Sequence, residues 1–240
     1  MRIEMRTIVV TGGAVGIGRA TAERFRADGD AVVITGRREE LLVKAAAEMG
    51  ATPVVCDATD PEQVERLVRE LPERVDVLVN NAGGNADLDR PDGDLRQLKA
   101  NWIANLEANL ISAVLTTTGL APRLTTAVVH LGSIAGARSG SGSYGASKAA
   151  LGLWSADVAA ELGPRGITSN VVAPGFTAET EFFRGKLSDE RRQMLLAATL
   201  TKREGQVGDI ADTIHFLTTP AARHITGQLL HVNGGAHTTR

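Results

Sequence analysis

The chain has 240 residues, of which 43% are hydrophobic and 22% are charged, and its formal net charge is −2. This length and balance suit a single folded α/β domain over residues 1–240 and do not fit a disordered chain. The near-neutral charge, without a long basic block, gives no support for nucleic acid or an anionic membrane as a partner.

Short apolar runs alternate with amphipathic segments in the first half of the chain. The apolar runs are continuous and rich in β-branched residues, which is typical of parallel strands covered on both faces. We predict strands at Thr7–Thr11, Ala31–Thr35, Thr52–Cys56 and Val75–Val79, and helices at Gly16–Ala27, Arg38–Met49 and Pro61–Glu70. The short links between them predict a parallel sheet with right-handed crossovers.

The second half continues this alternation. We predict helices at about Asp94–Gly119, Ser143–Leu162 and Asp209–Leu217, and strands at Ala127–Leu131, Ile167–Val172 and Gln228–Val232. Pro174-Gly175 breaks the chain after the sixth strand, and a polar, arginine-rich stretch follows to about Arg203. The whole pattern predicts a single doubly wound (Rossmann-type) α/β domain, with a parallel sheet of about seven strands and helices on both faces.

No segment resembles a targeting or membrane-spanning sequence. Met1 to Arg6 is mixed and charged, and the longest apolar stretch, about Ala149–Ala160, is interrupted by Ser155 and Asp157. The single cysteine, Cys56, cannot form an internal disulfide, which fits a reducing compartment. We therefore expect a soluble, cytoplasmic protein.

A glycine-rich run lies where the first predicted strand meets the first predicted helix. Glycine permits tight turns there and lets the backbone approach a pyrophosphate. The helix N-terminus adds free N–H groups and the positive end of its dipole. We therefore expect a dinucleotide to bind at Thr11, Gly12, Gly13, Gly16, Ile17 and Gly18.

The end of the second strand normally decides between NAD(H) and NADP(H), because a carboxylate there binds the adenosine ribose and repels a 2′-phosphate. In this chain Gly36 is followed by Arg37 and Arg38, and no carboxylate comes before Glu39. Arg37, with or without Arg38, would pair with a 2′-phosphate, so we expect NADP(H) to be preferred. NAD(H) stays an alternative, since two solvated arginines that open a helix would give the same pattern.

The only tyrosine of the chain, Tyr144, precedes Lys148 by one helical turn, so the two lie on one face of a predicted helix. A free phenol has a pKa of about 10. We expect the ammonium and a cationic nicotinamide to lower the pKa of Tyr144. Tyr144 could then give a proton to a carbonyl oxygen or remove one from an alcohol. Ser133, after the fifth strand, would hold the same oxygen, and Lys148 would also anchor the nicotinamide ribose.

Taken in order along the chain, these motifs resemble the short-chain dehydrogenase/reductase family, and the resemblance covers nearly the whole chain. It implies a Rossmann-type fold and an oxidoreductase that acts on CH–OH or C=O groups with NAD or NADP. The motifs are the run Thr11–Gly18, Asn80-Asn81-Ala82-Gly83, Asn109, Ser133 with Tyr144 and Lys148, Pro174-Gly175 and Asn233-Gly234-Gly235.

The resemblance also implies roles for single residues. Asn109 resembles the helix asparagine whose backbone carbonyl holds a water in a proton relay to Lys148, and we count it with the catalytic residues. Further cofactor contacts are implied to the adenine, the adenosine ribose and the nicotinamide. These positions are Asp57 for the adenine, Asn81, Ala82 and Gly83 for the ribose, and either Thr177 or Thr180 for the nicotinamide carboxamide. Ala58, Pro174 and Gly175 are further expected cofactor-binding positions.

Two departures from the family pattern leave alternatives open. The step from Ser133 to Tyr144 is shorter than usual, so Ser139, Ser141 and Ser143 are also candidates for the hydroxyl. Ser133 is favoured because it follows a strand at the carboxyl edge of the sheet, where such folds bind ligands. One extra residue after Pro174-Gly175 is the reason that Thr177 and Thr180 both stay candidates for the carboxamide contact.

Two segments, Gly84–Lys99 and Phe176–Arg203, are expected to form the rims of a substrate pocket, the second as a lid at about 176–203. The simplest interpretation of the second segment is a solvated amphipathic lid. The alternative is a basic dock for an acidic acyl carrier protein. Its apolar residues are Phe176, Phe182, Phe183, Met194, Leu195 and Leu196, and its basic ones are Arg184, Lys186, Arg191 and Arg192.

Three functions follow from these observations. The first is an NADP(H)-dependent oxidoreductase that transfers a hydride between nicotinamide and a small-molecule carbonyl or alcohol substrate, with Tyr144 as acid–base. The second is a 3-oxoacyl-thioester (acyl-carrier-protein) reductase, which uses the same chemistry with a defined partner. The third is a catalytically idle nucleotide-binding sensor or scaffold, which the complete set of tyrosine, lysine and glycines disfavours.

The predicted helix Ser143–Leu162 is rich in small residues, which permit close approach of a second helix, and Trp154 offers an anchor. Members of the family commonly pair this helix and the preceding long one across a two-fold axis. We therefore expect a homotetramer, with a homodimer as the alternative.

Overall fold

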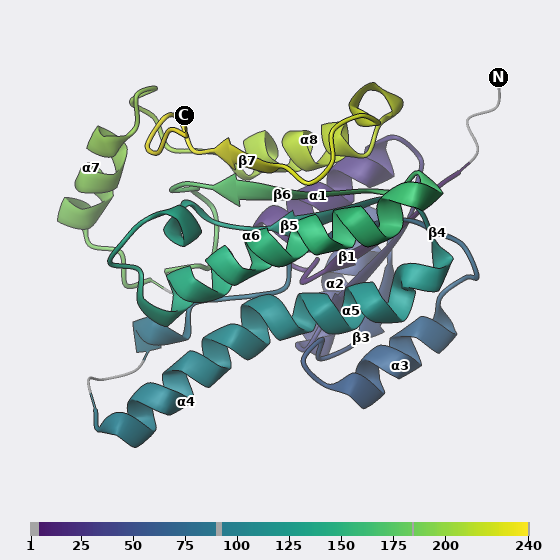
Figure 1. Cartoon of the computed structure of the whole chain (residues 1–240), viewed down its shortest axis with the longest axis horizontal. Coiled ribbons are helices and arrows are strands. Elements are labelled where there is room, and N and C mark those ends of the chain that lie inside the picture. Colours follow the sequence, from purple (N-terminus) through teal and green to yellow (C-terminus); the bar gives the residue numbers. More distant parts are fainter. Residues whose placement is uncertain (1–4, 90–92, 184, 240) are drawn as a thin grey trace.

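Seven parallel strands form one sheet at the centre of the fold (Figure 1). The computed structural model describes residues 5–89, 93–183 and 185–239. The strand order is β3-β2-β1-β4-β5-β6-β7, which confirms the predicted doubly wound α/β domain. The strands are β1 (Thr7–Thr11), β2 (Ala31–Gly36), β3 (Thr52–Val55), β4 (Val75–Asn80), β5 (Leu124–Leu131), β6 (Thr168–Pro174) and β7 (Leu229–Val232).

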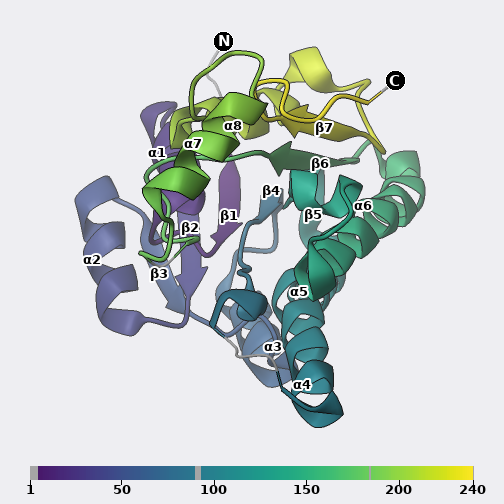
Figure 2. The same ribbon diagram turned by 90° about the vertical axis from the view of Figure 1, so that its left-hand side faces the viewer.

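Helices cover both faces of this sheet (Figure 2). Strand β1 supplies both cores, because successive side chains of a strand point to opposite sides: Ile8 and Val10 join the first core, and Val9 joins the second. On the first face lie α1 (Gly16–Ala27), α2 (Glu39–Met49) and α8 (Val207–Leu217), and on the second lie α3 (Pro61–Glu70), α5 (Ser112–Leu120) and α6 (Gly142–Leu162). Trp154 of α6 packs against the second core, with its ring 5.2 Å from that of His130.

Two helical segments differ from the prediction. The predicted helix Asp94–Gly119 is divided into α4 (Leu95–Leu106), a π turn (Glu107–Ile111) and α5. The π turn inserts an extra residue, a local feature that helical periodicity does not reveal. The polar stretch before Arg203 contains α7 (Asp189–Ala198), which buries none of its residues and therefore shows no core-facing pattern.

The carboxyl ends of the strands meet at one edge of the sheet, and the strand order reverses between β1 and β4. Such a switch point leaves a crevice outside the strand ends, where this class of fold binds ligands. Strand boundaries shift slightly from the prediction: β5 begins at Leu124 and β6 ends at Pro174. Within the described ranges, no helix is long and apolar enough to cross a membrane.

Candidate active site

The turn between β1 and α1 takes a backbone shape that requires glycine. Gly12 and Gly16 have φ angles of 66° and 54°, in the left-handed region that other residues rarely adopt. A Cβ at Gly18 would overlap the Gly12 carbonyl oxygen and the Asn81 side chain. Helix α1 has no side-chain cap and no acidic residue in its first turn. Its first N–H groups therefore suit a pyrophosphate, and the residues present fit the predicted dinucleotide.

Hydrogen bonds join this turn to the turn after β4. Thr11 Oγ1 accepts from the backbone N–H of Asn81 at 3.0 Å and of Ala82 at 2.9 Å. Asn81 Nδ2 donates back to the carbonyl oxygens of Thr11 at 2.9 Å and Gly12 at 3.0 Å. The Thr11 hydroxyl and Asn81 Nδ2 are thus used inside the protein, so both residues support the glycine-rich turn.

Charged residues meet at the ends of β2 and β3, where the family pattern expects the adenosine. Asp57 Oδ1 accepts from the N–H and the hydroxyl of Thr59, and its Oδ2 lies 3.7 Å from Arg37 Nη1. The Arg37 side chain is 75% exposed, so it is free to turn toward a ligand. Arg38 Nη2 binds Glu181 Oε2 at 2.8 Å, across to the segment 176–203. Both arginines therefore lie at the expected place, each beside a carboxylate.

Ser133, Tyr144 and Lys148 come together at the end of β5. The Tyr144 side chain is 8% exposed and lies near the Ser133 hydroxyl, which acts to lower the pKa of the phenol. The same hydroxyl accepts from the Ala135 N–H at 3.1 Å. Lys148 lies one turn further along α6, and its Nζ donates to the Leu131 carbonyl oxygen at 2.7 Å. The same nitrogen lies 6.0 Å from the centroid of the Tyr144 ring. The structure thus assembles the three side chains that the sequence singled out.

The pKa of Tyr144 departs from the prediction. Burial raises it to about 12, and the hydrogen bond from Ser133 opposes this only in part. Burial also lowers the pKa of Lys148 to about 8. The expectation that the ammonium lowers the pKa of Tyr144 is therefore wrong for the protein's own groups, because desolvation outweighs every other effect. The influence of a cationic nicotinamide stays a prediction.

The π turn directs the Asn109 side chain toward the turn after β4. Asn109 Oδ1 accepts from the Gly84 N–H at 3.1 Å, and its Nδ2 donates to the Gly84 carbonyl at 2.8 Å. A Cβ at Gly83 would lie 2.6 Å from Asn109 Oδ1 and 3.5 Å from Lys148 Nζ, so Gly83 is the residue that lets these groups come close. The water relay from the Asn109 carbonyl stays a prediction.

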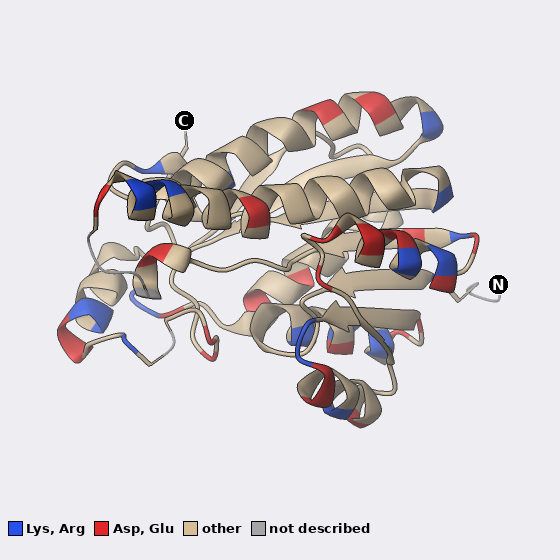
Figure 3. Ribbon diagram, turned by 90° about the horizontal axis from the view of Figure 1, so that it is seen from below, with Lys and Arg blue, Asp and Glu red and all other residues tan. Residues whose placement is uncertain are grey.

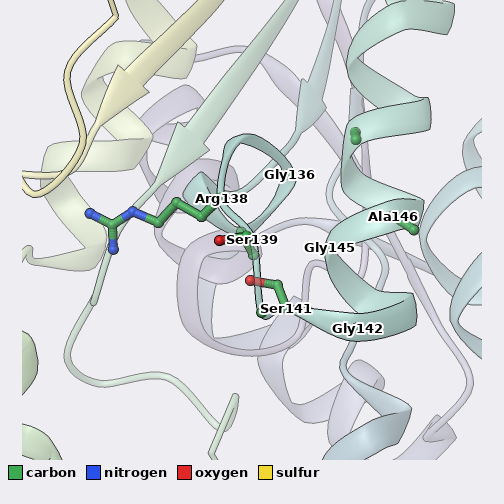
Figure 4. A pocket seen from close by; sticks show the side chains of 10 residues that line it. Gly136, Arg138, Ser139, Ser141, Gly142, Gly145 and Ala146 are labelled. Atoms are coloured by element: carbon green, nitrogen blue, oxygen red, sulfur yellow. The ribbon is translucent and has the colours of Figure 1, made fainter.

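The other candidate serines lie elsewhere. Ser139 and Ser141 line a shallow pocket between the turn after β5 and the start of α6 (Figure 4). Ser143 is 2% exposed, and its hydroxyl binds the Asp87 carboxylate at 2.8 Å. Of the four candidate serines, Ser133 is the one whose hydroxyl acts on the pKa of the Tyr144 phenol, which favours the choice made from the sequence.

Aromatic side chains of the segment 176–203 cover the tyrosine. The Phe182 ring centroid lies 5.4 Å from that of Tyr144, at an interplanar angle of 56°. Phe183 packs edge-on against Phe182 at 5.0 Å and against Phe176 at 6.0 Å. This apolar cluster contributes to the burial that raises the pKa of Tyr144.

The two candidate threonines are placed differently. Thr177 is 7% exposed, and its hydroxyl donates to the Gly175 carbonyl oxygen at 3.3 Å. Thr180 packs over the glycine-rich turn, where a Cβ at Gly16 would lie 3.7 Å from the Thr180 Cα and Cβ. Pro174 is the last residue of β6, and Ala58 is buried after β3. Both threonines thus border the crevice, and both stay candidates.

Sequence reasoning missed two polar residues next to Tyr144. Asp87 and Asn105 bind each other and Ser143, the residue directly before Tyr144. Neither belongs to a motif that the sequence analysis used. A polar residue at position 105, one turn before Asn109 and inside an otherwise amphipathic helix, was the one available signal.

Comparisons with known proteins agree with this geometry. The family model described as enoyl-(acyl carrier protein) reductase matches residues 12–237. A protein of Mycobacterium tuberculosis named as an oxidoreductase is 38% identical over 230 residues, covering 95% of this chain and 97% of its own length. The 3-oxoacyl-(acyl-carrier-protein) reductase of Escherichia coli is 35% identical over 248 residues and 99% of each chain.

Solved structures show the same fold. A short-chain dehydrogenase/reductase from Brucella melitensis superposes with a TM-score of 0.89 at 31% identity, covering 100% of both chains. A blue fluorescent protein from a metagenomic library, solved in complex with NADPH, superposes with a TM-score of 0.85 at 29% identity, covering 99% of this chain and 100% of its own.

Fold, site and relatives together define an oxidoreductase that works with a nicotinamide cofactor. The chain belongs to the short-chain dehydrogenase/reductase family, as its motifs predicted.

Proposed function

We propose that this oxidoreductase transfers a hydride between NADP(H) and a small-molecule carbonyl or alcohol substrate, with Tyr144 as the acid–base. The position of the buried Tyr144 between the Ser133 hydroxyl and the buried Lys148 carries the proposal. The nicotinamide, when bound, supplies the hydride, and the protein supplies orientation and proton transfer.

The protein's own residues provide the polar steps. In reduction, Ser133 holds the substrate oxygen and Tyr144 gives it a proton. The high pKa of Tyr144 keeps the phenol protonated at neutral pH, which suits a donor. Lys148, with a pKa of about 8, can hold or release a proton near neutral pH. It can therefore supply a proton to replace the one that Tyr144 has given to the substrate. The 176–203 segment acts as a lid, with the Phe182 ring keeping water away from the phenol.

Replacing Tyr144 with phenylalanine tests this role. We expect kcat to fall by a factor of about 10² to 10⁴, because a proton donor is lost, while the Kd for NADPH stays unchanged. Ser133→Ala should also lower kcat, whereas Ser139→Ala, a matched serine in the neighbouring pocket, should not. Near-normal turnover of Tyr144→Phe would overturn the assignment.

The preference for NADP(H) rests on Arg37 and Arg38 at the end of β2. Arg37 is largely exposed, and an Arg–phosphate pair is bidentate and strong. Arg37→Ala should lower the ratio of kcat/KM for NADPH to kcat/KM for NADH by about tenfold or more. An unchanged ratio would show that Arg37 does not bind the 2′-phosphate.

A second candidate function is the reduction of a 3-oxoacyl thioester on an acyl carrier protein. The Escherichia coli relative with that name, 35% identical over 99% of each chain, favours it. The basic dock on the lid is less open than the sequence suggested. Arg192 forms a two-pronged ion pair with Glu204 at 3.0 and 2.8 Å, and Lys186 donates to the Leu88 carbonyl oxygen at 3.1 Å. Arg184 and residues 90–92, which belong to the two segments predicted to form the rims, lie outside the described residues.

Kinetics with free and carrier-bound thioesters separate the two candidates. A carrier-dependent reductase should show a much higher kcat/KM on the carrier-bound substrate, and Arg191→Glu should lower only that value. Equal kcat/KM values for the free and the carrier-bound substrate would exclude an acyl carrier protein as a partner. A catalytically idle sensor is disfavoured, because Ser133, Tyr144 and Lys148 are all present at the site and the relatives are named as oxidoreductases or reductases.

We also propose that the chain forms a homotetramer, with a homodimer as the alternative. Figure 3 shows long stretches without charged residues on the two helical runs α4–α5 and α6. Exposed apolar residues lie on them, including Leu95, Leu98 and Trp102 on α4 and Leu153 on α6. Trp154 is partly buried against the protein's own core, and its role as an anchor stays a prediction. A monomeric mass by light scattering would contradict the proposal.

A further inference from the structure

Three polar side chains form a closed ring of hydrogen bonds at the start of α6. The Ser143 hydroxyl donates to Asp87 Oδ1 at 2.8 Å, and Asn105 Nδ2 donates to the same oxygen at 3.0 Å. Asn105 Nδ2 also donates to Ser143 Oγ at 2.8 Å. Asn105 is 0% and Ser143 2% exposed, so the contact between them is shielded from solvent, and the two contacts with Asp87 are partly buried. A largely buried ring of this kind, with each member partnered, has one preferred geometry.

The Asp87 carboxylate also caps helix α6. Its Oδ2 accepts from the backbone N–H of Tyr144 at 3.3 Å. The residue at the N-cap position, Ser141, makes no side-chain capping bond of its own. A carboxylate from a distant turn therefore provides the acceptor and the negative charge that a helix N-terminus favours.

The ring joins three segments that build the site. Asn105 Oδ1 accepts from the Ala86 N–H at 2.9 Å, which fixes the turn after β4. The Asn105 carbonyl oxygen accepts from Asn109 Nδ2 at 2.9 Å, which connects the ring to the π turn. Through Ser143 the ring reaches the first turn of α6, which carries Tyr144. A loss of Asp87 would leave Asn105 and Ser143 with unpaired polar groups and release that turn.

We propose that Asp87 is a positioning residue for Tyr144, acting through Asn105 and Ser143 to fix the first turn of α6. It does not touch the reacting atoms. Its effect is to keep the phenol beside the Ser133 hydroxyl, and the inference therefore rests on the proposed role of Tyr144. A misplacement of a reacting group by about 1 Å can cost about a hundredfold in rate.

Kinetics of Asp87 variants test this role. Asp87→Ala should lower kcat by about ten- to hundredfold, while the KM for the carbonyl substrate and the Kd for NADPH change by less than about threefold. Asp87→Asn keeps one acceptor oxygen for Ser143 and Asn105 but loses the acceptor for the Tyr144 N–H, so it should recover only part of kcat. Asp60→Ala is the matched control, because Asp60 caps α3 with two backbone N–H bonds far from Tyr144. It should lower stability but leave kcat unchanged.

A double-variant cycle separates positioning from a general loss of packing. Because the ring acts as a unit, adding Ser143→Ala to Asp87→Ala should lower kcat by little more than the first change alone. A folded Asp87→Ala protein with wild-type kcat would overturn the inference. It would also be overturned if the decrease in kcat of the double variant equalled the product of the decreases of the two single variants. If Asp87→Ala does not fold, Ser143→Ala decides, and a normal kcat for it overturns the inference.

The outcome for Tyr144→Phe distinguishes this inference from the proposed function. If Tyr144→Phe is inactive and Asp87→Ala is normal, only the positioning role fails. If Tyr144→Phe is active, the proposed function fails, and the positioning role fails with it.

Discussion

Replacing Lys148 with methionine should remove a pH dependence from the stability of the folded protein. Lys148 is 5% exposed, and burial lowers its pKa from 10.5 to about 8. At about 1.4 kcal/mol for each pKa unit, this difference corresponds to about 3 kcal/mol of destabilisation wherever the lysine is charged in both states.

The sign follows from the number of protons bound in each state. Below about pH 8 the lysine is charged in both states, and the full cost of burying it is present. Between about pH 8 and 10.5 the unfolded chain keeps the proton that the folded protein has lost, so the free energy of unfolding rises with pH. Cys56, whose pKa burial raises to about 11, acts in the opposite direction, but its effect is the same in both proteins and cancels in their difference.

Urea titrations of both proteins from about pH 7 to about pH 10, at one fixed protomer concentration, measure the effect. The wild type should gain about 2 kcal/mol relative to Lys148→Met over this range. Lys44→Met is the control, because the Lys44 side chain is 74% exposed and should show no such trend. A difference that stays constant to within about 0.5 kcal/mol would refute the claim that Lys148 is desolvated.

Three further predictions concern the cofactor crevice. Gly18→Ala places a methyl group against the Asn81 side chain, so the glycine-rich turn must move. The Kd for NADPH, measured by fluorescence, should rise by about tenfold or more. Thr11→Val leaves two backbone N–H groups without their acceptor and should cost about 2–3 kcal/mol in urea unfolding; a loss below about 0.5 kcal/mol would contradict the support role. Glu181→Gln frees Arg38 from an exposed ion pair and should tighten NADPH binding by at most about fivefold, while the affinity for NADH stays unchanged. An unaltered affinity for NADPH would show that Arg38 does not bind the 2′-phosphate.

The sequence alone predicted the parallel sheet, the glycine-rich turn and the set of Ser133, Tyr144 and Lys148. These features are local, because a buried strand needs a continuous apolar run and a tight turn before a helix needs glycine. The same local rules missed α7, whose residues face solvent, and the π turn, which changes the spacing of a helix without changing its composition.

Tertiary structure decided which of these residues meet and how they ionise. Ser133, and not Ser139, Ser141 or Ser143, reaches Tyr144, because β5 and α6 bring the two side chains to one edge of the sheet. Asp87 lies far from Tyr144 along the chain, so only folding reveals that it caps α6. The pKa of Tyr144 rises where its sequence neighbours suggested a fall, because burial by distant segments outweighs a lysine one turn away. Sequence thus determined which chemical groups are available, and desolvation and contacts between remote segments determined what each group can do.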